Sequence, residues 1–316
     1  MTVGALIGIG IVFLAIAAFL LYSERGRIFR RSTAAFLKVG SRREALRNLI
    51  SLRLIKLYVY GRWTKGYLGH QKKRTLPRMS PKKRRRWAEL THFKVLTLDN
   101  AKSIVTVEED IALRNLEQII PFATARDIVL KGPPDIAVYE CGCRLSNPNP
   151  CSPTQVCMVM GQPFVDFILD HHPKTSRRIN REEAMELIEA EHQRGHVQTA
   201  WFKEICFNRF YALCNCCPCC CVGIQAVCKH GIPMAASSGY VARVDESLCS
   251  GCSTCANSCP FSAIAVDGTA TVLWEKCMGC SVCADRCPQG AMSMARDEKK
   301  GVPMDLKLLA GRSADA

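Results

Sequence analysis

The first long apolar run of the chain covers residues 3–22 and contains no charged side chain. About 20 apolar residues in a helix span the core of a bilayer, so the pattern predicts a transmembrane anchor over residues 1–24. Basic residues follow the run, beginning with Arg25 and Arg27, and none precedes it. The positive-inside rule then predicts a single-pass protein of the cytoplasmic membrane, with its N-terminus outside and its body cytoplasmic. A cleaved signal peptide fits less well, because it needs a positive segment before a shorter apolar core.

Beyond residue 90 the apolar pattern mixes two periods and predicts an α+β fold, with a cysteine-rich domain over residues 91–235. Thr106 followed by Glu109 forms a capping box, so residues 106–120 are expected to form a helix. Two short apolar runs flank a Gly-Pro-Pro turn and predict strands at 127–130 and 136–139. A second capping box and a glycine stop predict a helix over residues 181–194.

Positive charge is concentrated near the N-terminus. Residues 25–87 hold 21 Lys and Arg against one acid, Glu44, in a chain whose net charge is +15. Residues 25–90 are therefore predicted to be a basic juxtamembrane region that attracts anionic headgroups. The mixed apolar and basic stretch 46–60 favours an interfacial helix within it. Nucleic-acid binding is not expected, because the predicted anchor already accounts for the charge.

Cysteine usage changes the picture most. All 20 cysteines lie at or beyond position 141, a density typical of disulfide scaffolds or metal proteins. Two runs read C-x2-C-x2-C-x3-C-P, and each cysteine of the first recurs 28 residues later in the second. Runs that end in Cys-Pro are typical of iron–sulfur sites rather than of zinc sites or disulfides. Their members are Cys249, Cys252, Cys255 and Cys259, then Cys277, Cys280, Cys283 and Cys287.

With these runs, residues 240–296 resemble the bacterial ferredoxins that carry two [4Fe-4S] clusters. The resemblance implies a ferredoxin module over residues 236–300 and a tail over 301–316 that is expected to fray. In these ferredoxins the fourth cysteine of each run binds the other cluster. The implied ligands are therefore Cys249, Cys252, Cys255 and Cys287 for the first cluster, and Cys277, Cys280, Cys283 and Cys259 for the second.

Twelve further cysteines predict at least one more metal centre, with an iron–sulfur cluster favoured over zinc. Its candidate ligands are Cys141, Cys143, Cys151, Cys157, Cys214, Cys217, Cys220 and Cys228. Cys206 is an alternative to Cys228 as the fourth ligand beside Cys214, Cys217 and Cys220. The C-x-C-R and C-N-C-C-x-C-C-C motifs make residues 136–240 resemble ferredoxin-like iron–sulfur proteins of anaerobic bacteria. The charge of Arg144 is expected to stabilise thiolates nearby, and His192 with His196 is expected to be a surface pair.

Several classes of function lack their motifs. The chain has no glycine-rich nucleotide loop on a strand-to-helix turn, no P-loop and no nucleophile elbow. No organic cofactor and no catalytic residue are therefore predicted. The expected function is a membrane-anchored electron carrier that connects redox partner proteins. The alternative is the iron–sulfur subunit of a redox enzyme, or a redox sensor, with a reactive centre in the cysteine block 206–228.

Overall fold

A computed structural model describes residues 3–22, 31–50, 66–114, 116–307 and 309 of the chain. Within these residues a seven-stranded sheet has the strand order β6-β4-β5-β8-β7-β1-β9. Every neighbouring pair is antiparallel except β1 and β9, which are parallel. The strands are β1 Thr91–Val95, β4 Ile136–Glu140, β5 Gln155–Met160, β6 Ser176–Ile179, β7 Val197–Lys203, β8 Phe210–Cys216 and β9 Ala235–Ala236.

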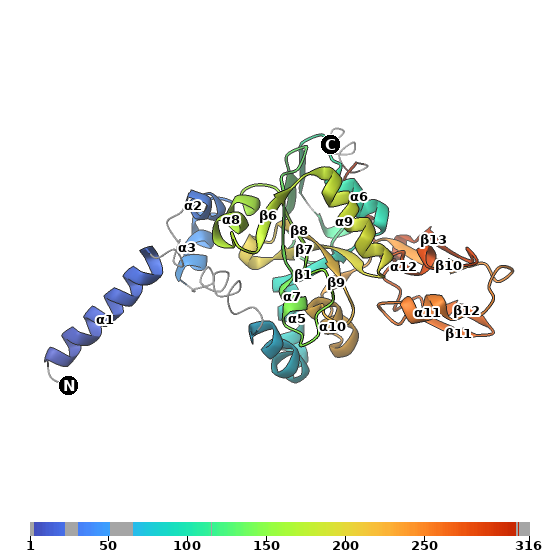
Figure 1. The fold of residues 1–316 in the computed structure, drawn as a ribbon, viewed down its shortest axis with the longest axis horizontal. Coiled ribbons are helices and arrows are strands. Elements are labelled where there is room, and N and C mark those ends of the chain that lie inside the picture. The colour runs from blue at the N-terminus through green and yellow to red at the C-terminus, as the bar shows by residue number, and fades with distance from the viewer. Residues whose placement is uncertain (1–2, 23–30, 51–65, 115, 308, 310–316) are drawn as a thin grey trace.

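Helices cover both faces of this sheet (Figure 1). Because side chains alternate along a strand, Met158 and Leu213 face a core that contains α6 Leu98–Val105 and α9 Arg181–Gln193. Cys157 and Cys214 face a second core, which contains α8 Phe164–His171 and α10 Val222–His230. The predicted helix at 181–194 is confirmed, and the side chain of Asn180 caps it by accepting the backbone N–H of Glu183 at 2.8 Å.

The basic N-terminal region contains short helices. The helix α2 Arg31–Leu37 packs on α8 through Phe36, whose ring lies 4.6 Å from that of Phe167. The predicted interfacial helix 46–60 lies largely outside the described residues, which stop at 50 and resume at 66. The described elements of the region are α2 Arg31–Leu37, α3 Arg42–Ile50, η1 Gln71–Thr75, η2 Leu76–Arg78 and α5 Pro81–Leu90.

The predicted transmembrane anchor is wrong. The apolar run does form a helix, α1 Val3–Tyr22, which projects from the rest of the chain (Figure 1). However, no helix in the described part of the chain is long and apolar enough to cross a membrane. The predicted single-pass topology and membrane localisation depended on this anchor, so they are wrong as well.

Two further predictions of local structure are wrong. Residues 106–120 do not form a helix. Thr106 ends α6, and the strand β2 Ile111–Arg114 follows, after which comes η3 Leu116–Gln118. The strand β2 pairs with β3 Asp127–Leu130. The strands predicted at 127–130 and 136–139 are confirmed as β3 and β4. The tail does not fray throughout, because Met304 and Leu306 are fully buried against the core that contains α6.

Residues 240–296 form a C-terminal module at the end of the molecule opposite α1 (Figure 1). Its first and last strands pair with each other, which joins the two ends of the module. The two middle strands form a hairpin. The elements are β10 Tyr240–Val244, α11 Thr254–Ser258, β11 Ile264–Asp267, β12 Thr269–Val272, α12 Val282–Asp285 and β13 Met292–Arg296.

Candidate metal centres

The two cysteine runs fold in the same way. Three pairs of residues that are 28 positions apart share a positive φ angle: Gly251 and Gly279, Ser253 and Ser281, and Ser262 and Gly290. A Cβ atom on Gly251 would lie 2.2 Å from the backbone oxygen of Gly268, so this turn accepts only glycine. Each run therefore forms a tight loop, and the backbone repeat matches the sequence repeat.

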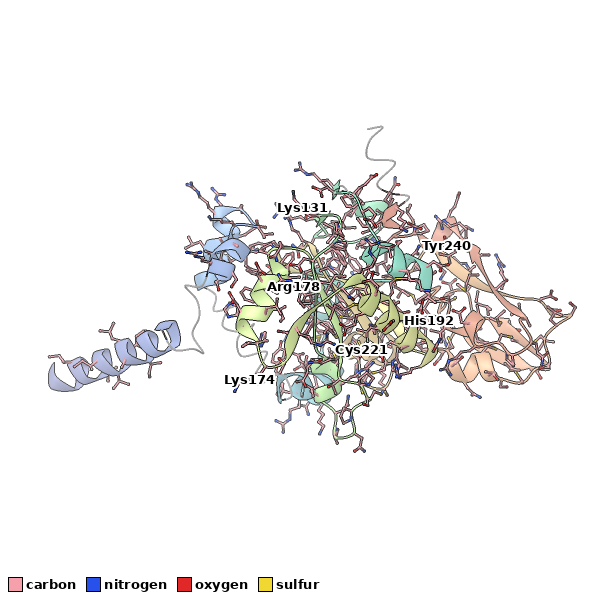
Figure 2. The ribbon with its side chains drawn as sticks, turned by 45° about the horizontal axis from the view of Figure 1, so that its top comes forward. Lys131, Lys174, Arg178, His192, Cys221 and Tyr240 are labelled. Atoms are coloured by element: carbon pink, nitrogen blue, oxygen red, sulfur yellow. The ribbon has the colours of Figure 1, made fainter. Side chains whose placement is uncertain are left out.

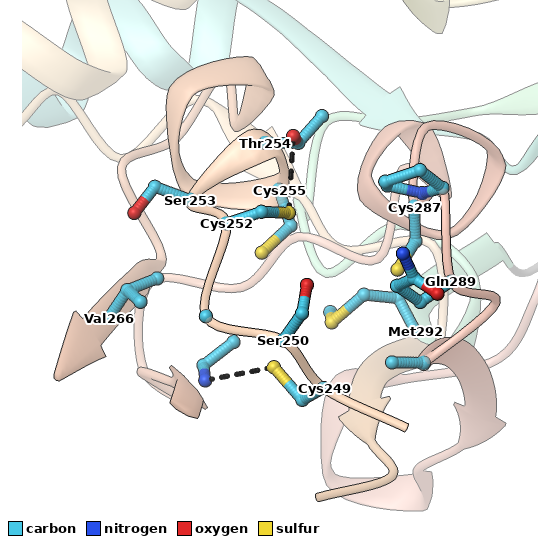
Figure 3. A pocket seen from close by; sticks show the side chains of 14 residues that line it. Cys249, Ser250, Cys252, Ser253, Thr254, Cys255, Val266, Cys287, Gln289 and Met292 are labelled. Carbon is cyan, nitrogen blue, oxygen red and sulfur yellow. Dashed lines mark hydrogen bonds between the residues drawn. The ribbon is translucent and has the colours of Figure 1, made fainter. Parts of the chain in front are cut away.

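The first pocket of the module is lined by four cysteines (Figure 3). Cys249 and Cys252 come from the loop between β10 and α11, and Cys255 lies on α11. Cys287 enters from the loop between α12 and β13, on the other side of the pocket. The structure thus brings together the four residues that the sequence assigns to one cluster, although their binding of a cluster stays a prediction.

The second pocket repeats this arrangement with the roles of the two runs exchanged. Cys277 and Cys280 come from the loop before α12, Cys283 lies on α12, and Cys259 follows α11. Each pocket therefore combines three cysteines of one run with the last cysteine of the other. A cysteine at the end of one run can reach the other pocket because α11 and α12 pack against each other.

The donor set of both pockets fits an iron–sulfur cluster. Backbone N–H groups donate to sulfur in each, from Ala270 to Cys249 at 3.4 Å and from Ala263 to Cys259 at 3.3 Å. Hydrogen bonds of this kind stabilise the anionic sulfur of a bound cluster. Burial raises the pKa of Cys283 to about 12. The thiolate therefore needs a cationic partner in the pocket, which bound metal supplies.

Paired pockets with four cysteines each are the mark of a known family. Residues 242–294 match the 4Fe-4S dicluster domain family. The C-terminal module thus matches a dicluster domain, and this match supports iron–sulfur binding by the module. The match covers under a fifth of the sequence and leaves the upstream cysteines outside the dicluster domain. No curated protein matches the chain.

A third group of cysteines lies outside the dicluster domain, and we call it the four-thiol group: Cys151, Cys217, Cys219 and Cys220. Its sulfur atoms all lie within 4.8 Å of one another. The sulfur of Cys151 is 3.0 Å from that of Cys219 and 3.7 Å from that of Cys220. A tetrahedral metal ion with bonds of about 2.3 Å to sulfur separates its ligand atoms by about 3.8 Å. The four-thiol group therefore has the size of a site for a single ion.

A buried charge network adjoins the four-thiol group. Arg144 is completely buried, pairs with the carboxylate of Glu191, and donates to the backbone oxygen of Asn215 at 3.3 Å. His196 lies 2.7 Å from Glu191 in the same network. Burial raises the pKa of Cys217, and the Arg144 cation opposes that rise. The charge of Arg144 therefore acts on a nearby thiol in the predicted direction.

The histidines were predicted wrongly as a surface pair. His192 is 3% exposed and His196 is 8% exposed. His192 joins the body to the dicluster domain, since its Nε2 atom lies 2.6 Å from the Asp285 carboxylate. Figure 2 shows His192 on the side of the body that faces the dicluster domain. The sequence gives no sign of this burial, because only the fold places the dicluster domain over the end of α9.

The upstream cysteines divide differently from the sequence prediction. Cys214 was grouped with Cys217 and Cys220, but it lies on β8 among other cysteines, whereas Cys217 follows the strand end. Cys206 and Cys228, the candidate fourth ligands, do not belong to the four-thiol group. Cys206 ends η4 Glu204–Cys206, and the sulfur of Cys228 lies 3.6 Å from the Pro260 oxygen. Sequence reasoning did not assign Cys216, Cys219 and Cys221, although the strand alternation of residues 214 and 216 could have indicated one of them.

Proposed function

We propose that this protein is an iron–sulfur electron carrier whose dicluster domain holds two [4Fe-4S] clusters with crossed ligation. The observation that supports it is the composition of the two pockets, each of which combines three cysteines of one run with the last cysteine of the other. A [4Fe-4S] cluster supplies one-electron oxidation and reduction. The donor and the acceptor are other redox proteins.

The chain's own part is to hold the clusters and to set their environment. Four thiolates fix each cluster, and the N–H groups of Ala263 and Ala270 stabilise the sulfur charge. Apolar side chains such as Met292 in the first pocket and Phe261 in the second keep water away. Burial and hydrogen bonds to sulfur are the two means by which a protein sets the potential of such a cluster.

The test is electron transfer by the full chain. Protein purified without oxygen is reduced by a low-potential viologen dye and mixed with an oxidised protein acceptor such as a cytochrome c in a stopped-flow instrument. We expect the cluster absorbance to recover while the acceptor is reduced in matching amount. A folded protein that contains iron and sulfide but neither accepts nor passes on electrons would refute the carrier function.

For the four-thiol group we propose one tetrahedral ion, zinc, in a structural role. All four positions are filled by cysteine, so no position remains for a substrate. The short sulfur–sulfur distances support a single ion over a larger cluster. This closed site also weakens the alternative of a reactive centre formed by Cys217, Cys219 and Cys220.

Elemental analysis tests the zinc site. We expect about one zinc per chain, and we expect Cys219→Ala to lose it while the iron content stays unchanged. Cys228→Ala, which removes an exposed cysteine of the same region, is the matched control and should keep the zinc. Iron with labile sulfide in the four-thiol group would contradict the zinc assignment.

A further inference from the structure

Six more cysteines gather where strands β4 and β8 end and strand β5 begins. Cys157 lies on β5 and pairs in register with Cys214 on β8. The others come from the end of β8, from the turn after β4 that begins α7 Gly142–Leu145, and from the residue that precedes α10. We call them the six-thiol group: Cys141, Cys143, Cys157, Cys214, Cys216 and Cys221. Figure 2 shows Cys221 inside the body of the molecule.

The six thiols form a ring of neighbours. Neighbouring thiols interact with one another in the order Cys214, Cys157, Cys141, Cys143, Cys221 and Cys216. The last contact joins the sulfurs of Cys216 and Cys221 at 3.3 Å. Cys214 and Cys216 stand two positions apart on β8, so they share one face of the strand and close the ring.

The spacing of this ring differs from that of the four-thiol group. Throughout the described residues, only the four-thiol group has three or more ligand atoms that all lie within 4.8 Å of one another. No three sulfurs of the six-thiol group therefore surround a point at the distance that one tetrahedral ion requires. The cysteines of the two dicluster pockets are spread in the same way. The ring thus has the wider spacing of a site for a cluster of several metal atoms.

The surroundings of the ring suit anionic sulfur. The backbone N–H of Val222 donates to the sulfur of Cys143 at 3.5 Å, the same kind of contact that both dicluster pockets contain. Val222 begins α10, a helix of nine residues whose N-terminus carries partial positive charge. The ammonium group of Lys72 donates to the backbone oxygen of Cys143 at 3.1 Å and adds a full positive charge nearby.

Simple packing does not account for the group. A reduced cysteine can act as a small apolar side chain, and Cys206 shows this behaviour, being buried within the apolar core. The six-thiol group instead gathers thiols from four separate segments of the chain beside a backbone N–H that donates to sulfur. Filling space with apolar side chains would not require sulfur at every one of these positions.

From this geometry we propose that the six-thiol group binds an iron–sulfur cluster of several iron atoms, separate from the four-thiol group and from the dicluster domain. Cys143 and Cys221 lie next to the N–H donor of Val222 and are ligands of this cluster. The remaining thiols supply the other ligands from the ends of the strands.

The position of α10 gives the proposed cluster a route to the dicluster domain. Cys221 precedes α10, and Cys228 near its other end lies 3.6 Å from the backbone oxygen of Pro260. Pro260 follows Cys259 and lines the second pocket. The seven residues that follow Cys221, up to Cys228, cover about 10 Å of helix. This segment connects the six-thiol group with the second pocket, and moving an electron between them neither forms nor breaks a bond. This consequence rests on the proposed carrier function, whereas the binding of the cluster does not.

The experiment compares iron and labile sulfide in full-length protein purified without oxygen. We expect the double variant Cys143→Ala with Cys221→Ala to lose about four irons and four sulfides per chain relative to the wild type. Cys206→Ala, which removes a buried cysteine outside the group, is the matched control and should lose none. Unchanged iron and sulfide in a folded double variant would overturn the proposal, and so would loss of zinc without loss of sulfide.

If the double variant does not fold, alkylation of the wild-type chain tests instead whether Cys143 and Cys221 bind the cluster. Native protein is treated with iodoacetamide before and after iron chelation, and the modified cysteines are identified by mass spectrometry. We expect Cys143 and Cys221 to be protected until iron is removed. Modification of both before chelation, or protection of both afterwards, would overturn the proposal. Cys277 and Cys280 report on the dicluster domain in the same sample, so a failure of the proposed function is distinguished from a failure of this inference.

Discussion

Cys287 lines a pocket with cysteines from the other run, and this placement can be tested directly. Cys287→Ala should lose about four irons and four sulfides per chain, because a cube needs four thiolates. Alkylation should then reach Cys249 and Cys252, while Cys277 and Cys280 stay protected. The opposite pattern, with Cys277 and Cys280 modified, would show that ligation is not crossed. Cys259→Ala is the matched control and should give that opposite pattern.

His92 carries a second prediction at the scale of single residues. The ring stacks on Phe122 at 4.3 Å, and burial lowers its pKa from 6.5 to about 4. Between pH 6.5 and about pH 4, His92 binds a proton in the unfolded chain but not in the folded chain. The contribution of His92 to the free energy of unfolding is therefore fully present above pH 6.5 and is lost as the pH drops towards 4. Lowering pH from 7.5 to 5.5 should cost about 1 kcal/mol through this residue.

Urea unfolding of the wild type and of His92→Phe at both pH values measures this contribution. The variant should lack about 1 kcal/mol of the acid destabilisation that the wild type shows. An identical loss of stability in both proteins would mean that His92 does not titrate in this way.

The contact between α9 and α12 is the clearest prediction at the scale of elements. His192 on α9 bridges Gln198 at 2.8 Å and Asp285 on α12 at 2.6 Å. Because His192→Ala would leave the largely buried Gln198 and the Asp285 carboxylate without this partner, we expect a loss of about 1–3 kcal/mol. Hydrogen exchange of α12 and calorimetric unfolding should both detect it. Glu186→Ala, on the exposed face of α9, is the control, and an equal effect of both changes would contradict the bridging role.

Local signals in the sequence predicted elements well where they were unambiguous. Asn180 and Glu183 predicted the start of α9, and the 28-residue repeat predicted two similar loops. The helix predicted over 106–120 does not form because Thr106 ends α6 instead of starting a new helix, and the apolar residues that follow also suit a short strand. Ile111 and Leu116 are buried, but the pairing of β2 with β3 determines the secondary structure. The spacing of apolar residues within one segment does not show that the segment pairs with a strand elsewhere in the chain.

The same limit applies to the metal centres. The spacing of the eight cysteines of the dicluster domain predicted two groups of four, and each group lines one pocket. It could not place Cys151 beside Cys219, which is 68 positions away. Nor could it separate Cys214 from Cys217, because that depends on β8 ending at Cys216. Groups of cysteines that lie far apart in the sequence can be identified only when the order and the ends of the strands are known.

At the scale of the whole molecule, the cysteines of both parts share one apolar core. The core beside α10 contains Cys157 and Cys214 of the sheet together with Cys255 and Cys277 of the dicluster domain. The dicluster domain therefore packs on the body rather than hanging from a linker. Continuous packing of this kind would hold the proposed centres at fixed separations, which suits the proposed transfer of electrons between them.

Coulometric titration of the full chain, purified without oxygen, tests the central claim most directly. Two [4Fe-4S] clusters in the dicluster domain predict that each chain reversibly takes up at least about two electrons. Cys287→Ala should lower that uptake by about one electron, since it disables a single cluster. A folded, iron-loaded chain that takes up no electrons reversibly, or whose uptake Cys287→Ala leaves unchanged, would contradict the account.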